Sequence, residues 1–233
     1  MTTVAERARP ALAFFDVDET VIAHKSMVEF WEYWLARNPS RVPEQVGDLR
    51  AEAAASRNRA ALNRRYYRRY AGVPLADLEA AGRRWYETYR RGDAAFVRAA
   101  VDAVAGHRAA GHEVILVSGS MMPLLEPLAQ ELGAAGVLCT ELVVRSDGAL
   151  TGEVHRPMIG ESKAEAAVRT MRERGVDPSD CFAYGDHESD LALLRAVGNP
   201  VVVGSSRVLN EEAERSGWMV VPAGRGPLRL ESA

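Results

Sequence analysis

The stretch "AFFDVDET", residues 13–20, decides the fold of this chain. Its apolar first half is followed at once by two aspartates, Asp16 and Asp18. An unpaired carboxylate is costly to bury, so acids at the end of an apolar segment call for an explanation. We expect Asp16 and Asp18 to lie at a functional site on the margin of a buried strand.

Three further apolar runs also stop abruptly at polar residues. "EVILV" ends at Ser118, "CFAYG" ends at Asp186 and "PVVVG" ends at Ser205. Short, nearly continuous apolar runs are typical of strands buried on both faces of a parallel sheet. Helical patterns separate them, at about 94–110, 122–133, 161–174 and 189–196. This alternation predicts an α/β fold with a Rossmann-like core around a central parallel sheet.

The ordered set of polar residues at the ends of these elements predicts one site. In such sheets ligands bind beyond the carboxyl ends of the strands, so Asp16, Ser118 and Asp186 should converge at one edge. Lys163 at the start of a predicted helix and Asp190, four residues after Asp186, extend the set. Segments far apart in the sequence are therefore expected to build a single centre.

Residues 22–92 have a different pattern and predict a helical insertion after the first strand. They contain at least three helical stretches and no clear buried strand. In "SMVEFWEYWLAR", residues 26–37, the apolar side chains fall on one helical stripe: Met27, Phe30, Trp31, Trp34 and Leu35. We expect this helical insertion to pack on itself and to close over the edge of the sheet.

A second, smaller insertion is expected at about 140–155. There strand-like flanks surround Ser146-Asp147-Gly148, a good turn sequence for a β-hairpin. The predicted domains are a core made of 1–21 and 93–233, and the helical insertion 22–92.

Composition and charge exclude several classes of protein. Apolar residues make up 47% of the 233 residues and charged residues 26%, which is ordinary for a soluble globular chain. The net charge of −3 argues against general affinity for nucleic acid or acidic membranes. The longest apolar runs are far too short to span a membrane, and no signal-peptide pattern opens the chain. We expect a cytoplasmic protein, with no membrane or nucleic-acid partner.

Cysteine and lysine usage is also informative. The two cysteines, Cys139 and Cys181, have neither disulfide nor metal-site spacing, and we expect buried free thiols. The chain has 29 basic residues, but only Lys25 and Lys163 are lysines. These two positions are candidates for places where arginine cannot replace lysine.

The motifs together resemble those of the haloacid dehalogenase (HAD) superfamily of phosphohydrolases, over nearly the whole chain. "DVDET" matches the first motif DxDxT, and the second and third are the serine of "VSGS" and the lysine of "ESKAE". "GDHESD" matches the fourth motif. The helical insertion, with "AYGDHESDLALL" and a late "GW", looks most like the cap of subfamily IB, the phosphoserine-phosphatase-like branch.

The resemblance implies a role for each motif residue. Asp16 would be the nucleophile that forms an aspartyl-phosphate, and Asp18 the acid and base that serves the leaving alcohol and the water. Dehalogenase members lack this second aspartate, which favours phosphate ester hydrolysis. Ser118, with Gly119, would hold a phosphate oxygen, and Lys163 would bind the phosphate and stabilise its charge.

The resemblance also implies Mg²⁺ as the cofactor, an ion that prefers oxygen ligands. Its expected ligands are Asp16, the backbone carbonyl of Asp18, and Asp186. Asp190 is expected to orient Lys163 and metal-bound waters, without binding the ion directly.

Lys25 departs from the family pattern. Phosphoserine phosphatases usually carry a glutamate nine residues after the nucleophile, where it meets the substrate ammonium. Lys25 at this position would repel an ammonium and attract a carboxylate or a second phosphate; the alternative is that Lys25 points to water. His187 is expected at the rim of the pocket, and Ser189 could keep a hydrogen bond in the fourth motif.

The basic, aromatic stretch "RNRAALNRRYYRRY", 57–70, allows three interpretations. It could be a solvated helix that buries Leu62, Tyr66 and Tyr70, with the Arg57–Arg69 charges in water. One or two arginines could instead steer the substrate. Its composition is also that of a nucleic-acid surface, which the acidic total disfavours.

The leading functional hypothesis is a Mg²⁺-dependent phosphatase for a small phosphorylated metabolite. The alternatives are a phosphoserine phosphatase proper, a phosphomutase that shares Asp16 and Asp18, and a non-catalytic phosphoester-binding protein. The sequence makes no prediction of the oligomeric state.

Overall fold

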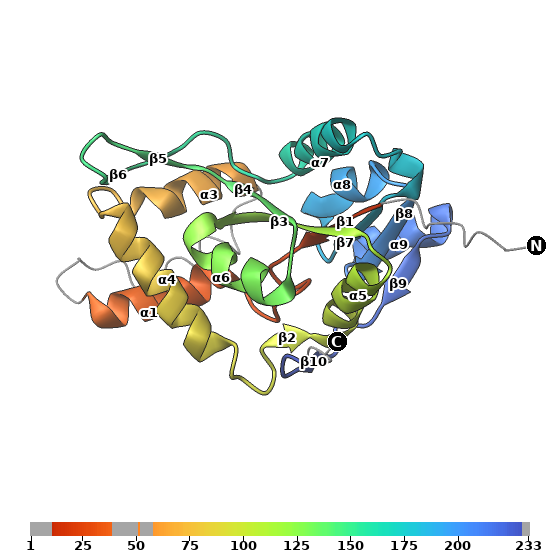
Figure 1. Cartoon of the computed structure of the whole chain (residues 1–233), viewed down its shortest axis with the longest axis horizontal. Coiled ribbons are helices and arrows are strands. Elements are labelled where there is room, and N and C mark those ends of the chain that lie inside the picture. The colour runs from red at the N-terminus through yellow and green to blue at the C-terminus, as the bar shows by residue number, and fades with distance from the viewer. Residues whose placement is uncertain (1–10, 39–50, 52–57, 230–233) are drawn as a thin grey trace, which may run out of the picture.

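A six-stranded parallel sheet forms the centre of the structure, which is a computed structural model that describes residues 11–38, 51 and 58–229 (Figure 1). Its strand order is β4-β3-β1-β7-β8-β9. The strands are β1 (Leu12–Asp16), β3 (Glu113–Met121), β4 (Gly136–Thr140), β7 (Phe182–Gly185), β8 (Asn199–Val203) and β9 (Met219–Val221). All four predicted apolar runs are strands of this sheet, which confirms the α/β fold.

Side chains of β1 alternate between two hydrophobic clusters, one on each face of the sheet. Phe15 stacks on Tyr184 with ring centroids 4.2 Å apart, in the cluster shared with α5 (Arg98–Ala109) and α6 (Met122–Leu132). Phe14 lies in the other cluster, with residues of α7 (Glu161–Arg174), α8 (Leu191–Arg195) and α9 (Arg207–Ser216). Both rings are fully buried, and each such burial contributes about 2 kcal/mol. Because helices cover both faces of the sheet, the residues of β1 do not alternate between polar and apolar.

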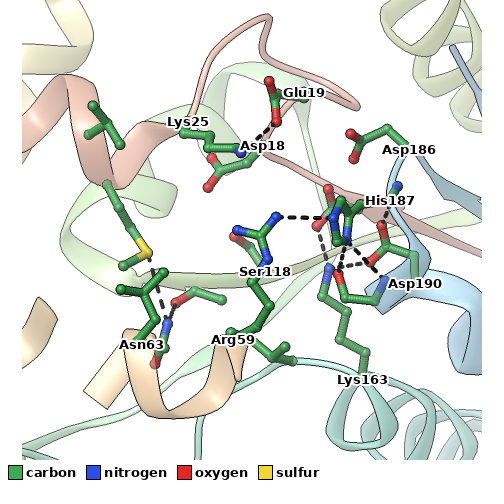
Figure 2. A pocket seen from close by; sticks show the side chains of 17 residues that line it. Asp18, Glu19, Lys25, Arg59, Asn63, Ser118, Lys163, Asp186, His187 and Asp190 are labelled. Atoms are coloured by element: carbon green, nitrogen blue, oxygen red, sulfur yellow. Dashed lines mark hydrogen bonds and ion pairs between the residues drawn. The ribbon is translucent and has the colours of Figure 1, made fainter. Parts of the chain in front are cut away.

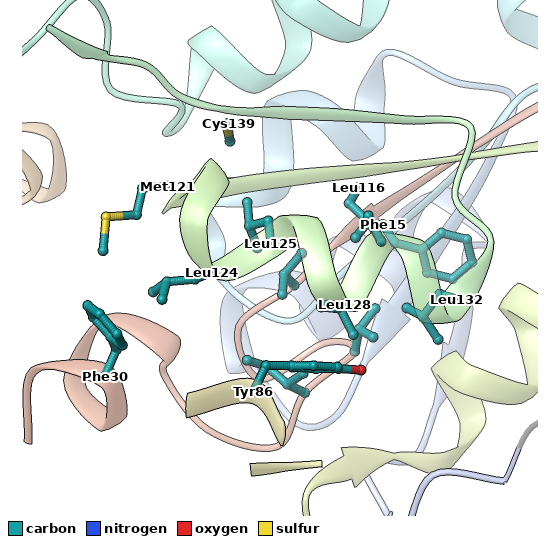
Figure 3. Close-up of a cluster of buried hydrophobic side chains, with 14 of the residues drawn as sticks. Phe15, Phe30, Tyr86, Leu116, Met121, Leu124, Leu125, Leu128, Leu132 and Cys139 are labelled. Carbon is teal, nitrogen blue, oxygen red and sulfur yellow. The ribbon is translucent and has the colours of Figure 1, made fainter. Parts of the chain in front are cut away.

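Helix α6 joins the sheet to the helical insertion. Its buried leucines contact Phe15 and Leu116 of the sheet on one side, and Phe30 and Tyr86 of the insertion belong to the same cluster (Figure 3). Gly82 of α4 (Leu75–Tyr89) touches this helix so closely that an added Cβ would lie 2.0 Å from the carbonyl oxygen of Pro123.

The helical insertion leaves the core after β1 and returns at β2 (Phe96–Val97), so the two ends lie side by side. Ile22 and Phe96 form an antiparallel bridge, and the N–H of Ala23 donates to the carbonyl of Ala95 at 2.8 Å. Strand β2 also pairs with β10 (Arg225–Gly226). The helical pattern expected from residue 94 therefore begins only at Arg98, because the preceding residues are extended and paired.

Within the described residues the insertion contains α1 (Ser26–Arg37), α3 (Arg59–Arg68) and α4. The predicted stripe of α1 faces inward: Phe30, Trp31 and Trp34 are buried, and Met27 and Leu35 are half-buried. In α3 and just after it, Tyr66 and Tyr70 are buried as expected. Leu62 was expected in the core but is only half-buried, because it lies in the wall of a pocket; Arg57 lies outside the described residues.

The predicted hairpin is present as β5 (Leu142–Val144) and β6 (Leu150–Val154), which pair antiparallel. Gly148 has a φ of 82°, and the Asp147 carboxylate accepts a hydrogen bond from the N–H of Ala149, so the turn residues act as the sequence indicated. Cys139 and Cys181 are buried and free. Among the described helices, none has the length and hydropathy needed to cross a membrane.

Candidate active site

A pocket of about 130 Å³ opens at the carboxyl edge of the sheet, between the core and the helical insertion (Figure 2). Every site residue expected from the sequence lines it: Asp16, Asp18, Lys25, Ser118, Gly119, Lys163, Asp186 and Asp190. The structure thus brings together residues from the ends of β1 and β7, from β3, and from the start of α7. His187 and Ser189 also line the pocket, as expected for the loop after β7.

Lys163 lies between two aspartates at the base of the pocket. Its Nζ is 2.5 Å from Oδ1 of Asp16 and 2.6 Å from Oδ1 of Asp190, and its side chain is 5% exposed. Burial alone would lower the pKa of Lys163, but the two carboxylates raise it above its ordinary value. Gly185 makes this arrangement possible, because a Cβ there would lie 2.6 Å from the Cβ of Asp190. The lysine is therefore held as a cation.

Three acids, Asp16, Asp186 and Asp190, have carboxylate oxygens within 4.8 Å of one another. Burial, together with the neighbouring acids, raises the pKa of Asp186 to about 7 and that of Asp16 well above its usual range. Three carboxylates against one ammonium leave an excess of negative charge, and oxygen donors suit Mg²⁺. The donor set of these acids therefore fits a divalent cation.

The turn after β1 fixes the second aspartate. The N–H of Val21 donates to the carbonyl of Val17 at 2.9 Å, and Glu19 has a φ of 65°, a strained value for a residue with a side chain. The Asp18 carboxylate accepts a hydrogen bond from the N–H of Ser26 at 3.0 Å. Burial raises the pKa of Asp18, although the hydrogen bonds from Ser26 oppose this shift.

Two links from the turn and from α1 were not expected from the sequence. The hydroxyl of Thr20 donates to Asp186 at 3.1 Å, which joins the loops after β1 and β7. The hydroxyl of Ser26, at the start of α1, bonds that of Ser120 in β3 at 3.0 Å. The helical insertion is therefore bonded to the loops that carry the site.

The carbonyl of Gly119 also joins the helical insertion to the core. It accepts hydrogen bonds from Asn63 Nδ2 at 2.7 Å, Tyr67 Oη at 2.9 Å and Thr140 Oγ1 at 2.9 Å. Sequence analysis missed these residues. One signal was available: Asn63 and Tyr67 are four apart on the buried face of α3, and a buried amide needs partners.

Charged groups from both parts of the chain form the rim of the pocket. Lys25 Nζ lies 3.2 Å from Oε2 of Glu19, and both side chains are 40% exposed. Arg59 Nη2 of α3 lies 3.0 Å from Nε2 of His187 (Figure 2). The apolar wall comes from Met27, Val28, Leu62 and Ile159.

Comparison with known proteins agrees with this geometry. The sequence profile of the haloacid dehalogenase-like hydrolases matches residues 13–195. The chain belongs to the haloacid dehalogenase-like hydrolases. Phosphoserine phosphatase SerB1 of Mycobacterium tuberculosis is 28% identical over 218 residues, which cover 90% of this chain and 70% of the relative, in line with the predicted resemblance to subfamily IB.

Two relatives illustrate this membership. A probable phosphatase of Mycobacterium tuberculosis is 32% identical over 228 residues, which cover 95% of this chain and 78% of the relative. The inhibition of morphological differentiation protein of Streptomyces azureus is 40% identical over 125 residues, 54% of this chain, and the match spans only 45% of that relative.

Solved structures share the fold. A protein of unknown function from Bordetella pertussis superposes with a TM-score of 0.77 at 25% identity, over 91% of this chain and 98% of its own. A phospho-aspartyl intermediate analogue of phosphoserine phosphatase has a TM-score of 0.68 at 19% identity, over 94% and 95% of the two chains. This haloacid dehalogenase-like hydrolase therefore shares the fold of these two structures.

Proposed function

We propose that this phosphatase hydrolyses a small phosphomonoester with the help of Mg²⁺, through an aspartyl-phosphate on Asp16. One observation carries the proposal: Asp16 at the end of β1 lies in the same buried cluster as Lys163, Asp186 and Asp190. A carboxylate that attacks a phosphate dianion needs nearby positive charge, and this cluster contains a fixed ammonium and a donor set for a divalent cation.

The first half-reaction forms a bond between a carboxylate oxygen of Asp16 and phosphorus, and breaks the bond between phosphorus and the ester oxygen. Asp18, held by the N–H of Ser26, gives its proton to the departing alcohol. In the second half-reaction Asp18 takes a proton from the attacking water, and the acyl phosphate is hydrolysed to free phosphate. Ser118 and Gly119 hold the phosphate oxygens, and Lys163 balances their charge.

Mg²⁺ would be held by the carboxylates of Asp16 and Asp186, with the carbonyl of Asp18 by family resemblance. When bound, it stabilises negative charge on the transferring phosphoryl group. Asp190 keeps Lys163 in place from the opposite side.

The substrate is a small phosphorylated molecule, and phosphoserine itself is disfavoured. Lys25 occupies the place of the glutamate that would meet a substrate ammonium, and it lines the pocket. A cation there repels an ammonium.

The test is turnover of p-nitrophenyl phosphate with and without Mg²⁺, for the wild type and for Asp16→Asn. We expect Mg²⁺-dependent release of phosphate that the variant loses by several orders of magnitude, with an unchanged circular dichroism spectrum. Tight phosphoester binding without hydrolysis would favour a phosphoester-binding protein. An isomerised phosphate product would favour a phosphomutase.

A further inference from the structure

The contact between Arg59 and His187 at the rim of the pocket lacks an acceptor. The backbone N–H of Ser189 donates to Nδ1 of His187 at 3.1 Å, so that nitrogen carries no proton. A neutral imidazole then carries its proton on Nε2. Nε2 lies 3.0 Å from Nη2 of Arg59, and a guanidinium nitrogen can only donate. Two N–H groups therefore face each other.

An anion that accepts a hydrogen bond from each of these two N–H groups would satisfy both donors. Among the described residues no carboxylate pairs with Arg59, which lines the pocket. Arg59 comes from α3 and His187 from the loop after β7, and both line the pocket. Lys25 adds positive charge to the same rim, offset in part by Glu19.

We propose that Arg59 and His187, supported by Lys25, bind a second anionic group of the substrate, on the alcohol that leaves. This inference rests on the proposed phosphatase function and narrows it. The substrate class is a phosphomonoester whose alcohol carries a carboxylate or a second phosphate. An ammonium beside that group is disfavoured, because the rim would repel it.

The test compares two pairs of esters that differ in the second anionic group. These are 2-phosphoglycolate with ethyl phosphate, and propane-1,3-diol bisphosphate with propyl phosphate. In one pair, we expect kcat/KM to be at least ten-fold higher for the ester that carries the second anionic group. Whether this is the 2-phosphoglycolate pair or the bisphosphate pair shows whether the rim binds a carboxylate or a phosphate. In Arg59→Gln, KM for that ester should rise about ten-fold, and KM for its partner without the second anionic group should not change. Arg59→Lys should restore part of the preference.

Arg68→Gln is the matched control, since Arg68 lies on the same helix, pairs with Glu153 and does not line the pocket. Arg68→Gln should leave KM unchanged for the preferred ester and for its partner. Hydrolysis of all four esters without preference, or a preference that survives Arg59→Gln, would overturn the subsite alone. Failure to hydrolyse any ester would overturn the proposed function.

A second, independent observation concerns the peptide group between Gly119 and Ser120. Its carbonyl accepts from Asn63, Tyr67 and Thr140. Its N–H, which belongs to Ser120, donates to Oγ of Ser118 at 3.0 Å. Hydrogen bonds to one end of a peptide polarise it and strengthen the bond made by the other end.

The Ser118 oxygen therefore accepts from the backbone, and its own proton remains available to an acceptor in the pocket. Two of the three donors to the carbonyl, Asn63 and Tyr67, belong to α3 of the helical insertion. We infer that Asn63 and Tyr67 are positioning residues. Through the peptide between residues 119 and 120, they direct the Ser118 hydroxyl toward the substrate phosphate.

Tyr67→Phe tests this inference, with Tyr66→Phe as a matched control. Both tyrosines are buried in α3, but the hydroxyl of Tyr66 bonds that of Tyr70. We expect Tyr67→Phe to raise the inhibition constant of inorganic phosphate roughly three- to ten-fold, the size of one hydrogen bond. Tyr66→Phe should leave it unchanged at equal thermal stability.

A double-mutant cycle gives the decisive readout. In a Ser118→Ala background there is no hydroxyl to direct, so Tyr67→Phe should have no further effect on phosphate inhibition. An undiminished effect in that background, or equal effects of the two tyrosine variants, would show that Tyr67 acts only through packing.

Discussion

The ammonium of Lys163 and the carboxylate of Asp16 are in direct contact at 2.5 Å, and both side chains are at least nine-tenths buried. The pair joins the end of the central strand to the first turn of α7. A buried ion pair is stabilised only when its geometry is good and its remaining hydrogen bonds are satisfied. Here the second carboxylate, that of Asp190, meets this need.

This contact predicts that arginine cannot replace Lys163. A guanidinium is planar and larger than an ammonium, so it cannot occupy the same point between the two carboxylates. We expect Lys163→Arg to lower kcat for p-nitrophenyl phosphate by at least 100-fold although the charge is kept. Steady-state kinetics measures this, and a variant with more than one-tenth of wild-type turnover would contradict it.

The proposed acid–base role of Asp18 predicts a dependence on the leaving group. An alkyl alcohol needs a proton to depart, whereas p-nitrophenolate does not. Asp18→Asn should therefore lower kcat/KM for ethyl phosphate about 100-fold more than for p-nitrophenyl phosphate. Equal losses on the two esters would remove the acid role.

The acid cluster predicts that Mg²⁺ stabilises the protein in the absence of substrate. At 100 times its dissociation constant, a ligand adds about 2.7 kcal/mol to the free energy of unfolding. We expect a rise in Tm of several degrees on adding Mg²⁺, reversed by EDTA and lost in Asp186→Asn. Glu188→Gln, an exposed neighbour, should keep the rise. An unchanged Tm in the wild type would argue against a metal site here.

The contact between α4 and α6 predicts opposite effects for two glycine substitutions within helices. Gly82→Ala should destabilise the protein by about 2 kcal/mol or more, because its Cβ would clash with the carbonyl of Pro123. Gly106→Ala in α5 meets nothing within 4 Å and should stabilise by about 0.5–1 kcal/mol. Urea denaturation of both variants measures the difference, and a loss of stability of equal size in both would disprove the packing argument.

His107 predicts a loss of stability in mild acid. It is buried between His112 and the hydroxyl of Tyr184, and burial lowers its pKa to about 4. The unfolded chain binds this proton at about pH 6.5, so the free energy of unfolding should fall as the pH drops from 6.5 to 4. The contribution is on the order of 2 kcal/mol, and it is fully present above pH 6.5.

Urea denaturation at pH 7 and pH 4.5 tests this contribution. His107→Gln should be less sensitive to the drop in pH than the wild type. His155→Gln, at an exposed position, should behave as the wild type does. Equal pH dependence in all three proteins would refute the assignment to His107.

The sheet and the polar centre were predictable because strands buried on both faces leave an unambiguous signal. Phe14 and Phe15 are adjacent and point to opposite clusters, so the run had to be apolar throughout. The carboxyl-edge rule then placed Asp16 and Asp186 in one pocket. Strand β9 gave no such signal, since Met219 and Val220 are exposed at the edge of the sheet.

The contacts between the helical insertion and the core could not be predicted in the same way. Asn63 and Tyr67 reach Gly119 because α3 packs along β6 and the end of β3, and no spacing in the sequence encodes that approach. The contact of Arg59 with His187 likewise joins residues 128 apart. Tertiary docking decides such pairs, whereas local periodicity decides strands and helices.

The backbone bridge between Ile22 and Phe96 has a consequence for how this enzyme could diversify. The two ends of the helical insertion are held together beside the sheet. A change in the segment between them therefore leaves the site residues at the sheet edge in place. A different set of helices at that junction would bring its own polar groups over Asp16, the proposed nucleophile, and leave Asp16 in place. The same hydrolase core could in this way acquire a different substrate specificity through the exchange of a single segment.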